Sequence, residues 1–394
     1  MFRTLRKNLL RRGGLAVAAM VLLTAVSSAA TWQIETVDQS GAGKSTSLKI
    51  DRDGNAHLAY VVEDGRSTLK YAFWDHLVKR WFVMKVAEGA EFPSMVLDSQ
   101  QRPHISWNNS RKLWHSFWDG VSSWKNLAIP LASETISYHT SIALDSQNNP
   151  NISFYEYDGP KGTEYRVRMR VVMWNGQNWE VSTVDGSNQS GKFNSIAADS
   201  RGRLHLAYAN VRTDTTSIRY GLWEGNSWHL ELVDGREVNN IGYSCHAVCI
   251  TLDQQEDPHV SYMDVEEKLV KYGVRKGGRW HTQNVDRVAG VAYADRNSIA
   301  VDEDGKPYIG YYDSGLGLAK LAHLEGSNWM VDVIDNGRCG FTSSLQIDRG
   351  TIWISYTDEG NGGGVKVARA ALSDLRRPAN TRSAASEKDM ARRH

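Results

Sequence analysis

Short stretches in which apolar and polar residues alternate recur from residue 31 to about residue 372, for example at His57–Tyr60 and Leu69–Trp74. A period of two is typical of β-strands that bury one face, so each stretch predicts a short strand. Apolar runs end at pairs such as Asp53-Gly54 and Asp304-Gly305. Asp bonds its own backbone and Gly accepts a positive φ, so these pairs predict tight turns. The pattern indicates an all-β chain of short antiparallel strands.

These strands belong to a longer repeat. Each unit begins with Ser, or with Cys249 in one unit, has Asp four residues later, and continues through a turn to a second strand that ends in an aromatic residue. Successive aspartates are 46 to 54 residues apart, as subtraction of their numbers shows. A period of this length indicates a repeat architecture. The seven aspartates are Asp51, Asp98, Asp145, Asp199, Asp253, Asp302 and Asp348.

Each unit divides into four strands, and the fourth strand begins at a tryptophan. The seven tryptophans are Trp32, Trp81, Trp124, Trp179, Trp228, Trp280 and Trp329. Trp32 precedes the first unit, whereas the last unit, from Ser344 to about Leu372, has three strands and no Trp strand after it. A ring resolves this offset, because the segment from Trp32 to Val37 becomes the missing fourth strand and no sheet edge stays open. We therefore predict an all-β fold, a seven-bladed β-propeller of four-stranded antiparallel blades whose last blade is closed by the N-terminal strand.

The two ends of the chain depart from the repeat. Residues 1–30 combine a basic start, an apolar stretch and a final Ser-Ala-Ala, which is typical of a signal peptide, with retention as an N-terminal anchor as the alternative. Residues 31–372 form the predicted propeller, and residues 373–394 are expected to be a disordered basic tail. No other segment could cross a bilayer. We expect a periplasmic or secreted protein with no membrane span in the mature chain.

Composition excludes one class of partner and leaves the cysteines open. The chain has 46 Lys and Arg against 45 Asp and Glu, so it lacks the basic excess of a nucleic-acid-binding protein. Cys245, Cys249 and Cys339 lack the second half of a zinc site, and we predict no metal and no cofactor. Calcium held by carboxylates is supported by no loop motif. Two interpretations stay open, a small disulfide between Cys245 and Cys249 or three part-buried thiols.

Residues that recur in most units are expected to be scaffold, because chemistry that is needed once does not require seven copies. The repeated Asp is expected to bond the amides of the following turn. The repeated tryptophans are expected to pack between outer strands. The histidines that share one position in the repeat are expected to pack inside the blades: His57, His104, His205 and His259.

The functional face is expected where strand one begins and strand two ends, because antiparallel neighbours bring these ends together beside the axis. Serines start most first strands, polar residues follow the second strands, and aromatic residues lie in the linkers. Such groups suit sugar rings; the alternative is that the serines cap linker turns and the acids bond neighbouring blades. The predicted ligand-binding residues are Asn109, Glu156, Asn210, Tyr243, Asp264, Tyr293, Asp313, Phe341 and Asp358.

The unit Ser-x-x-x-Asp, His-Ile-Ser-Tyr, Leu-Lys-Tyr-Ala and Trp resembles the repeats of sialidase-like (BNR-type) bacterial seven-bladed β-propeller proteins over residues 32 to about 372. Similar propellers include glycan-binding lectins and polysaccharide lyases. Sialidase activity itself is not expected, because the Asp-box spacing differs and no arginine triad is evident. Propeller lyases use a His or Tyr base and an Arg that neutralises the uronate. The resemblance therefore implies four catalytic candidates, Tyr138, His139, His246 and Arg338.

Three functions remain open at this point. The leading hypothesis is an exported carbohydrate-binding propeller that uses the channel-mouth face and takes a glycan or polysaccharide as its partner. The second is a polysaccharide lyase or glycoside hydrolase of the same fold, so whether the chain is an enzyme stays open. The third is a protein-interaction scaffold in the envelope, since the fold alone does not decide function.

Overall fold

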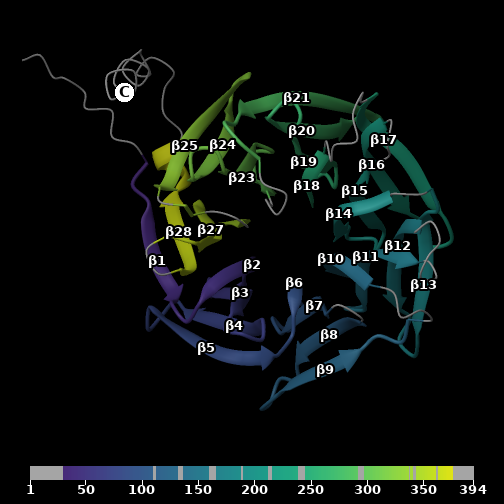
Figure 1. Cartoon of the computed structure of the whole chain (residues 1–394), viewed down its shortest axis with the longest axis horizontal. Helices are drawn as coiled ribbons and strands as arrows, with labels where there is room; N and C mark the ends of the chain where they lie inside the picture. Colours follow the sequence, from purple (N-terminus) through teal and green to yellow (C-terminus); the bar gives the residue numbers. More distant parts are fainter. Residues whose placement is uncertain are drawn as a thin grey trace, which may run out of the picture. The chain divides into compact units, whose positions relative to one another are not determined.

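The computed structural model describes residues 30–109, 112–131, 136–158, 166–187, 190–211, 215–237, 245–291, 297–336, 338–339, 343–360 and 363–375. Within these residues the chain forms seven four-stranded antiparallel sheets that surround a common axis (Figure 1). In six sheets the four strands follow chain order from the innermost strand to the outermost. The predicted seven-bladed β-propeller is therefore confirmed.

Each sheet runs outward from a first strand beside the axis to a fourth strand at the rim. The first two sheets contain β2 (Ala42–Ile50), β3 (Ala56–Glu63), β4 (Thr68–Asp75) and β5 (Arg80–Ala87), then β6 (Glu91–Leu97), β7 (Pro103–Asn109), β8 (Lys112–Trp118) and β9 (Trp124–Ala128). The next two contain β10 (Ile136–Leu144), β11 (Pro150–Asp158), β12 (Arg166–Trp174) and β13 (Trp179–Asp185), then β14 (Ser190–Ala198), β15 (Leu204–Val211), β16 (Thr215–Trp223) and β17 (Trp228–Glu237). The last three contain β18 (Cys245–Leu252), β19 (Pro258–Asp264), β20 (Leu269–Lys276) and β21 (Arg279–Arg287), then β22 (Ser298–Val301), β23 (Pro307–Asp313), β24 (Leu318–Glu325) and β25 (Asn328–Asn336), then β26 (Ser344–Asp348), β27 (Thr351–Asp358), β28 (Gly364–Ala371) and β1 (Gln33–Asp38).

The ring closes where β1 pairs antiparallel with β28. Gln33 lies opposite Arg369, and the pairing continues to Asp38, which lies opposite Val365. Side chains strengthen the same seam, since Nε of Arg369 donates to the amide oxygen of Gln33 at 3.1 Å and the guanidinium forms an ion pair with Glu35. The predicted closure of the last blade by the N-terminal strand is confirmed.

The repeated aspartate fixes the turn after each of six first strands. In the first sheet, Oδ1 of Asp51 accepts the backbone amides of Asp53 and Asn55 at 2.9 and 2.8 Å. Its Oδ2 lies 3.2 Å from Nε2 of His57, and Nδ1 of that ring lies 2.7 Å from the hydroxyl of Tyr71. The expected scaffold role is thus confirmed. The same pair of turn bonds forms at Asp98, Asp145, Asp199, Asp253 and Asp302.

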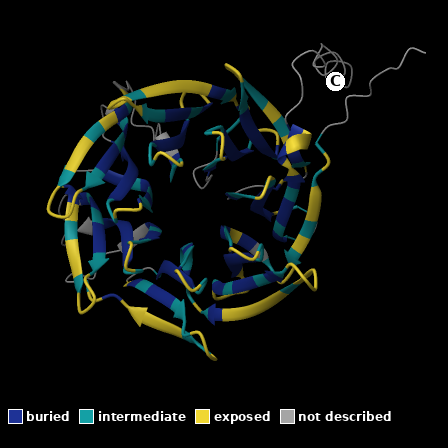
Figure 2. Cartoon of the chain, turned by 180° about the vertical axis from the view of Figure 1, so that it is seen from behind, coloured by how far each residue is buried: buried dark blue, intermediate teal, exposed yellow. Residues whose placement is uncertain are grey.

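The apolar core lies between neighbouring sheets, and the outer strands face solvent (Figure 2). One cluster joins Leu48 and Leu58 of the β2–β5 sheet to Val365 of β28 across the closure. Outer-strand tryptophans cover the third strand of the preceding sheet, as where Trp124 meets Tyr71 edge to face with ring centroids 5.2 Å apart. Burying such rings stabilises each seam by a few kcal/mol, roughly 25 cal/mol for each Å² of apolar surface.

A hydrogen bond from a second-strand tyrosine to an aspartate on the outer strand of the preceding sheet joins neighbouring sheets at five of the boundaries. The hydroxyl of Tyr60 on β3 donates to Oδ2 of Asp38 on β1 at 2.8 Å, and Nζ of Lys70 lies 2.9 Å from the same oxygen. Where Ala87 stands at the end of β5 in place of this aspartate, the following sheet carries Trp107 in place of the tyrosine. The other four pairs are Tyr208–Asp185, Tyr262–Asp234, Tyr311–Asp286 and Tyr356–Asp335.

The described chain ends in a single helical turn, α1 (Leu372–Leu375), which buries Leu372 and Leu375 in the core beside β28. This turn extends three residues past the predicted end of the propeller at residue 372. The predicted signal peptide, except for Ala30, and the tail from residue 376 lie outside the described residues. Among the described residues, no helix is long and apolar enough to cross a membrane.

Candidate functional site

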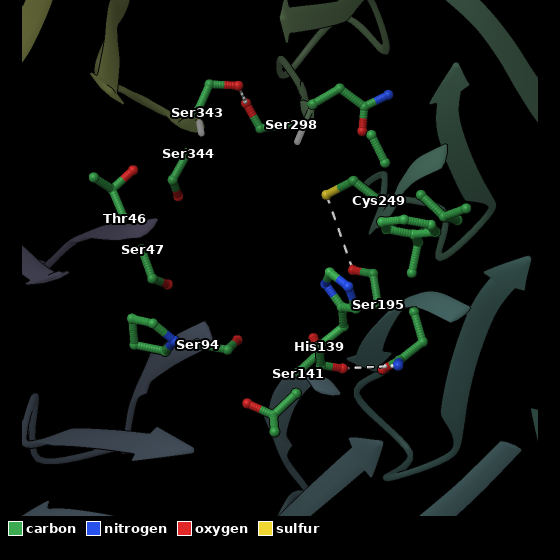
Figure 3. A pocket seen from close by; sticks show the side chains of 17 residues that line it. Thr46, Ser47, Ser94, His139, Ser141, Ser195, Cys249, Ser298, Ser343 and Ser344 are labelled. Carbon is green, nitrogen blue, oxygen red and sulfur yellow. Dashed lines mark hydrogen bonds between the residues drawn. The ribbon is translucent and has the colours of Figure 1, made fainter. Parts of the chain in front are cut away.

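A cavity of about 120 Å³ lies at the centre of the ring, where the first strands begin, and we name it the mouth cavity (Figure 3). All seven sheets contribute one ring residue to its wall. The ring residues are Ser47, Ser94, Ser141, Ser195, Cys249, Ser298 and Ser344. The residues just before them complete the wall together with His139, Phe193 and Ala247; they are Thr46, Pro93, Thr140, Asn194, Val248, Asn297 and Ser343. The cavity therefore lies on the face where the sequence places the site.

The serines of the ring hold neighbouring sheets together. Oγ of Ser47 accepts the amide of Met95 on the next first strand at 2.9 Å, and Oγ of Ser344 accepts the amide of Leu48 at 2.9 Å. Such a bond uses the oxygen as an acceptor, so the hydroxyl proton can still be donated into the cavity. The same contact joins three further seams, from Ser94 to Ile142, Ser141 to Ile196 and Ser195 to Ile250.

Three aromatic side chains form an arc, and two of them, His139 and Phe193, line the mouth cavity. The ring of His139 lies between those of Phe92 and Phe193, with centroid distances of 4.4 and 4.6 Å. All three residues have left-handed backbone, with φ of 49°, 56° and 52° for Phe92, His139 and Phe193, and each lies at a bulge in its first strand. This conformation costs a residue other than glycine about 1 kcal/mol or more. Strain of this kind gathers at ligand sites, where the surrounding structure maintains it.

Asn194 holds the middle of this arc in place. Its side-chain amide donates to the carbonyl of His139 at 2.8 Å and to that of Gly191 at 3.1 Å, while its Oδ1 accepts the hydroxyl of Ser153 at 2.6 Å. The bulge that carries His139 is therefore fixed from the neighbouring sheet. The arc is a rigid wall, and 8 % of the His139 surface is exposed.

Asn297 departs from the pattern of its equivalents in the other sheets. Thr140 and Asn194 at the same position in the repeat accept the hydroxyl of a second-strand serine. Asn297 is 5 % exposed, and among the described residues neither its amide nitrogen nor its amide oxygen has a hydrogen-bond partner. Ser261, the second-strand serine of the preceding sheet, is likewise buried with a hydroxyl that has no partner within that part of the chain. A buried polar group without a partner costs about 1–3 kcal/mol, so this amide favours a polar partner that the described residues do not supply.

Two of the predicted ligand-binding carboxylates are engaged by lysines. Asp313 lies 2.9 Å from Nζ of Lys320, and Asp358 lies 2.7 Å from Nζ of Lys366. Burial alone would lower the pKa of Lys366, but its bonds to Asp358 and Asp335 outweigh burial and raise that pKa above its usual value. Neither Asp313 nor Asp358 lines the mouth cavity.

The other described members of the predicted set lie in comparable surroundings. Glu156 forms ion pairs with two arginines of β12 at 3.3 and 3.0 Å, and the side-chain amide of Asn210 donates to the hydroxyl of Ser187 at 3.0 Å. Asn109 and Asp264 each accept a backbone amide three residues further along the chain. These contacts do not bring the set together around the mouth cavity, and a role in ligand binding stays a prediction.

Of the four catalytic candidates, the structure describes the side chains of His139 and Arg338. His139 lines the mouth cavity, whereas Arg338 is exposed on the segment between β25 and β26 and does not line it. The remaining candidates lie outside the residues whose side chains are described. These are Tyr138 and His246, and the same holds for the predicted ligand-binding residues Tyr243, Tyr293 and Phe341.

The two cysteines whose side chains are described, Cys249 and Cys339, are free thiols. Cys249 lines the mouth cavity, and its Sγ lies 3.9 Å from Oγ of Ser195. Cys339 is buried, and burial raises the pKa of its thiol to about 12. The side chain of Cys245 lies outside the described residues. Within the part of the chain that the structure describes, no three His, Cys, Asp or Glu side chains gather in a way that could hold a metal ion.

Sequence reasoning missed Asn297. The signal was present in the repeat itself, because Asn297 follows Arg296 directly before a ring serine, where other units carry Thr46 or Thr140. The sequence does not show that Asn297 lacks a partner, because this depends on the position of Ser261, the second-strand serine of the preceding sheet.

Comparisons with known proteins place the fold. No protein-family model and no curated protein matches the sequence. Among solved structures, a PL25 ulvan lyase bound to -[GlcA(1-4)Rha3S]- matches with a TM-score of 0.60 at 9% identity, over 86% of this chain and 95% of the lyase. The Aleuria aurantia lectin in complex with a fucosylated GlcNAc matches with a TM-score of 0.50 at 14% identity, over 74% of this chain and 96% of the lectin.

A Hadza microbial sialidase matches with a TM-score of 0.50 at 12% identity, over 78% of this chain and 74% of the sialidase. At such identities the likeness concerns the fold. The likeness to these three proteins therefore supports the fold, and the chain is a seven-bladed β-propeller.

Proposed function

We propose that this chain is an exported carbohydrate-binding propeller that takes its ligand at the mouth cavity. One observation carries the proposal: His139 and Phe193, two strained residues of the aromatic arc, line the same cavity as Asn297, whose buried amide has no partner among the described residues. The left-handed backbone recurs at Ala247, with φ of 56°, so the aromatic rings and the unpartnered amide are the features that depart from the repeat.

The two features match the chemistry of a sugar ring. A pyranose presents C–H bonds that pack against aromatic surface, and hydroxyls that both donate and accept hydrogen bonds. The amide of Asn297 can serve two adjacent hydroxyls, since it offers a donor and an acceptor side by side. The hydroxyls of Ser47 and Ser344 can donate hydrogen bonds to acceptors on the ligand, because their oxygens already accept backbone amides. A cavity of about 120 Å³ suits one end of a glycan rather than a long chain threaded through the ring.

Two further lines support the proposal. The solved propellers of similar fold include a lectin in complex with a sugar and a lyase bound to an acidic polysaccharide. Residues 1–30 have the composition of a signal peptide, which supports export to the periplasm or the medium, where extracellular glycans are met.

The test is a glycan array with the mature chain and two variants. His139→Asn removes one aromatic ring from the cavity wall and keeps a residue that tolerates left-handed backbone. Phe82→Ser, on the outer strand β5, removes an exposed phenylalanine far from the cavity and serves as the control. The proposal expects a set of glycans bound by the wild type and by the control, with the His139 variant binding at least tenfold more weakly. An array without hits, or equal binding by all three proteins, contradicts it.

Export is tested separately on the full chain. N-terminal sequencing of the protein recovered from the periplasm or the medium is expected to begin at or near Thr31. An uncleaved chain retained in the membrane fraction would favour the anchor instead.

A further inference from the structure

A second cavity, of about 510 Å³, lies where the ring closes, and we name it the closure cavity. Its wall combines the end of β4 and the turns at both ends of that sheet's β3 and β4 pair with β1, β28 and the start of β27, which lie beside the β2–β5 sheet (Figure 1). Gly54, in the turn after β2, lines the closure cavity, whereas Thr46 and Ser47, earlier on the same strand, line the mouth cavity. The two cavities therefore lie towards opposite ends of the first strands.

Two residues of this wall depart from the repeat. Arg369 on β28 lies opposite Trp353 on β27. Trp353 occupies the position at which the other sheets carry His, Asn or Tyr, and the partner of that position is apolar in five sheets and His323 in the sixth. The last sheet therefore places a guanidinium where the scaffold does not require one, as expected for a site that is needed once. The five apolar equivalents of Arg369 are Phe73, Phe117, Met173, Leu222 and Val274.

The guanidinium of Arg369 is held by both sheets that meet at the closure. Its Cζ lies 5.0 Å from the ring centroid of Trp74 and 5.2 Å from that of Trp353. Nε donates to the amide oxygen of Gln33 at 3.1 Å, and Nη2 donates to Oε1 of Glu35. A group fixed in this way loses little conformational freedom when it binds a ligand.

One edge of this guanidinium stays open. A guanidinium has five N–H bonds, and the contacts with Gln33 and Glu35 use the two on the edge formed by Nε and Nη2. The other three, on Nη1 and Nη2, have no acceptor among the described residues, and 24 % of the Arg369 side chain is exposed. Two parallel N–H bonds of this kind match two oxygens of a carboxylate, a phosphate or a sulfate.

The charges around the closure cavity leave room for one more anion. Glu35 already compensates Arg369. Lys79, in the exposed turn between β4 and β5, also lines the cavity and forms no ion pair within the described part of the chain. Asp374 is the single carboxylate among the lining residues. The ammonium of Lys79 can therefore balance the charge of an anion that pairs with the open edge of Arg369.

His76 adds a neutral polar group to the same wall. The amide of Asn55 is oriented by its donation to Oδ2 of Asp51 at 2.8 Å, so its oxygen faces His76. That oxygen accepts the backbone amide of His76 at 3.1 Å and lies 2.8 Å from Nδ1 of the ring. Because an amide oxygen only accepts, Nδ1 carries the proton and Nε2 is left for a hydroxyl of a ligand.

We propose that the closure cavity binds a small organic anion, whose carboxylate, phosphate or sulfate group pairs with the open edge of Arg369 and with Lys79. The volume of about 510 Å³ corresponds to roughly 17 water molecules at about 30 Å³ each, so the cavity holds more than an inorganic ion. It falls in the range of small-molecule sites, about 300–1,000 Å³. This site is independent of the mouth cavity and of what binds there.

The experiment is titration calorimetry of the purified protein with glucuronate, glucose 6-phosphate, glucose 6-sulfate and glucose, which share one ring so that only the charged group differs. Arg369→Met removes the guanidinium and installs the residue found at the equivalent position of the β10–β13 sheet. Lys79→Asn removes the second cation at a residue with φ of 52°. Its matched control is Lys268→Asn, at an exposed lysine with φ of 54° that does not line the cavity.

The expected result is that at least one of the three anions binds the wild type and Lys268→Asn, and that its charged group identifies the ligand class. Arg369→Met should bind that anion at least tenfold more weakly, and Lys79→Asn at least threefold more weakly. His139→Asn, in the mouth cavity, should bind it as the wild type does, and glucose should give no signal that depends on Arg369.

Four outcomes overturn the site. They are the absence of binding by all three anions, equal affinity of wild type and Arg369→Met, a glucose signal that disappears with Arg369, and an equal loss in His139→Asn, which would place the anion at the mouth. Guanidinium unfolding checks that each variant is folded. If Arg369→Met does not fold, equal affinity of Lys79→Asn and Lys268→Asn overturns the proposal.

Discussion

The hydrogen bond from Tyr60 to Asp38 joins the closing strand to the first complete sheet, and its removal tests how the ring is held shut. Tyr60 is fully buried, and its hydroxyl lies 2.8 Å from Oδ2 of Asp38. Tyr60→Phe deletes this hydrogen bond and keeps the aromatic side chain. Phenylalanine already occurs at this position of the repeat, since Phe154 occupies the equivalent position of the β10–β13 sheet.

The magnitude follows from the partners that remain. A hydrogen bond to a charged group contributes about 1.5–3 kcal/mol. Asp38 would keep the ammonium of Lys70 at 2.9 Å and the amide of Ser40 at 2.8 Å, so the carboxylate would not be left unpaired. We therefore expect a loss at the lower end, about 1.5–2 kcal/mol in the free energy of unfolding. Guanidinium unfolding of wild type, Tyr60→Phe, Asp38→Asn and the double variant measures it.

The pair should also show coupling and a defined pH dependence. A loss below about 0.5 kcal/mol, or strictly additive effects in the double variant, would refute the reasoning. Burial alone would raise the pKa of Asp38, but bonds from Lys70, Ser40 and Tyr60 outweigh burial and hold that pKa below 3.8. A carboxyl with a lowered pKa stabilises the fold above its unfolded value and loses that contribution as the pH falls through its folded pKa. The difference between wild type and Tyr60→Phe should therefore shrink below about pH 4.

Three further substitutions test separate parts of the account. Asn297→Leu should raise the free energy of unfolding by about 1 kcal/mol, because it removes an unpartnered buried amide, and should weaken glycan binding; a lower melting temperature speaks against the assignment. Cys249→Ser should stabilise by about 0.5–1 kcal/mol in calorimetry by supplying the hydroxyl that other seams use, and no gain would refute that role. Burial lowers the pKa of His57 although Asp51 opposes that shift, so protonation of this residue in the unfolded chain should reduce stability as the pH falls below about 6.5. His57→Asn should make the unfolding midpoint less dependent on pH between about pH 7.5 and 5.5. An unchanged pH dependence in this variant counts against the prediction.

The repeat predicted the architecture because each sheet carries its own markers. The aspartates that hold the turns and the tryptophans of the outer strands are visible in sequence, and their offset was enough to predict the pairing of β1 with β28. The last helical turn was missed, since Leu372 and Leu375 are two apolar residues in an otherwise polar stretch. Their burial depends on a neighbouring sheet that local pattern does not reveal.

The site was predicted less completely, for two physical reasons. The carboxylates expected around the mouth have cross-strand partners, such as Lys320 for Asp313, and spacing along one strand does not show a partner on another. The left-handed backbone at Phe92 and His139 involves residues that rarely adopt it, so no glycine marks the bulges in the sequence.

A crystal structure of the mature chain with the strongest array glycan tests the central claim most directly. The account predicts a sugar residue in the mouth cavity, with one face against His139 or Phe193 and a hydroxyl within hydrogen-bond distance of the Asn297 amide. Sugar density confined to the outer strands or to the grooves between sheets, with the mouth cavity holding only water, would contradict it.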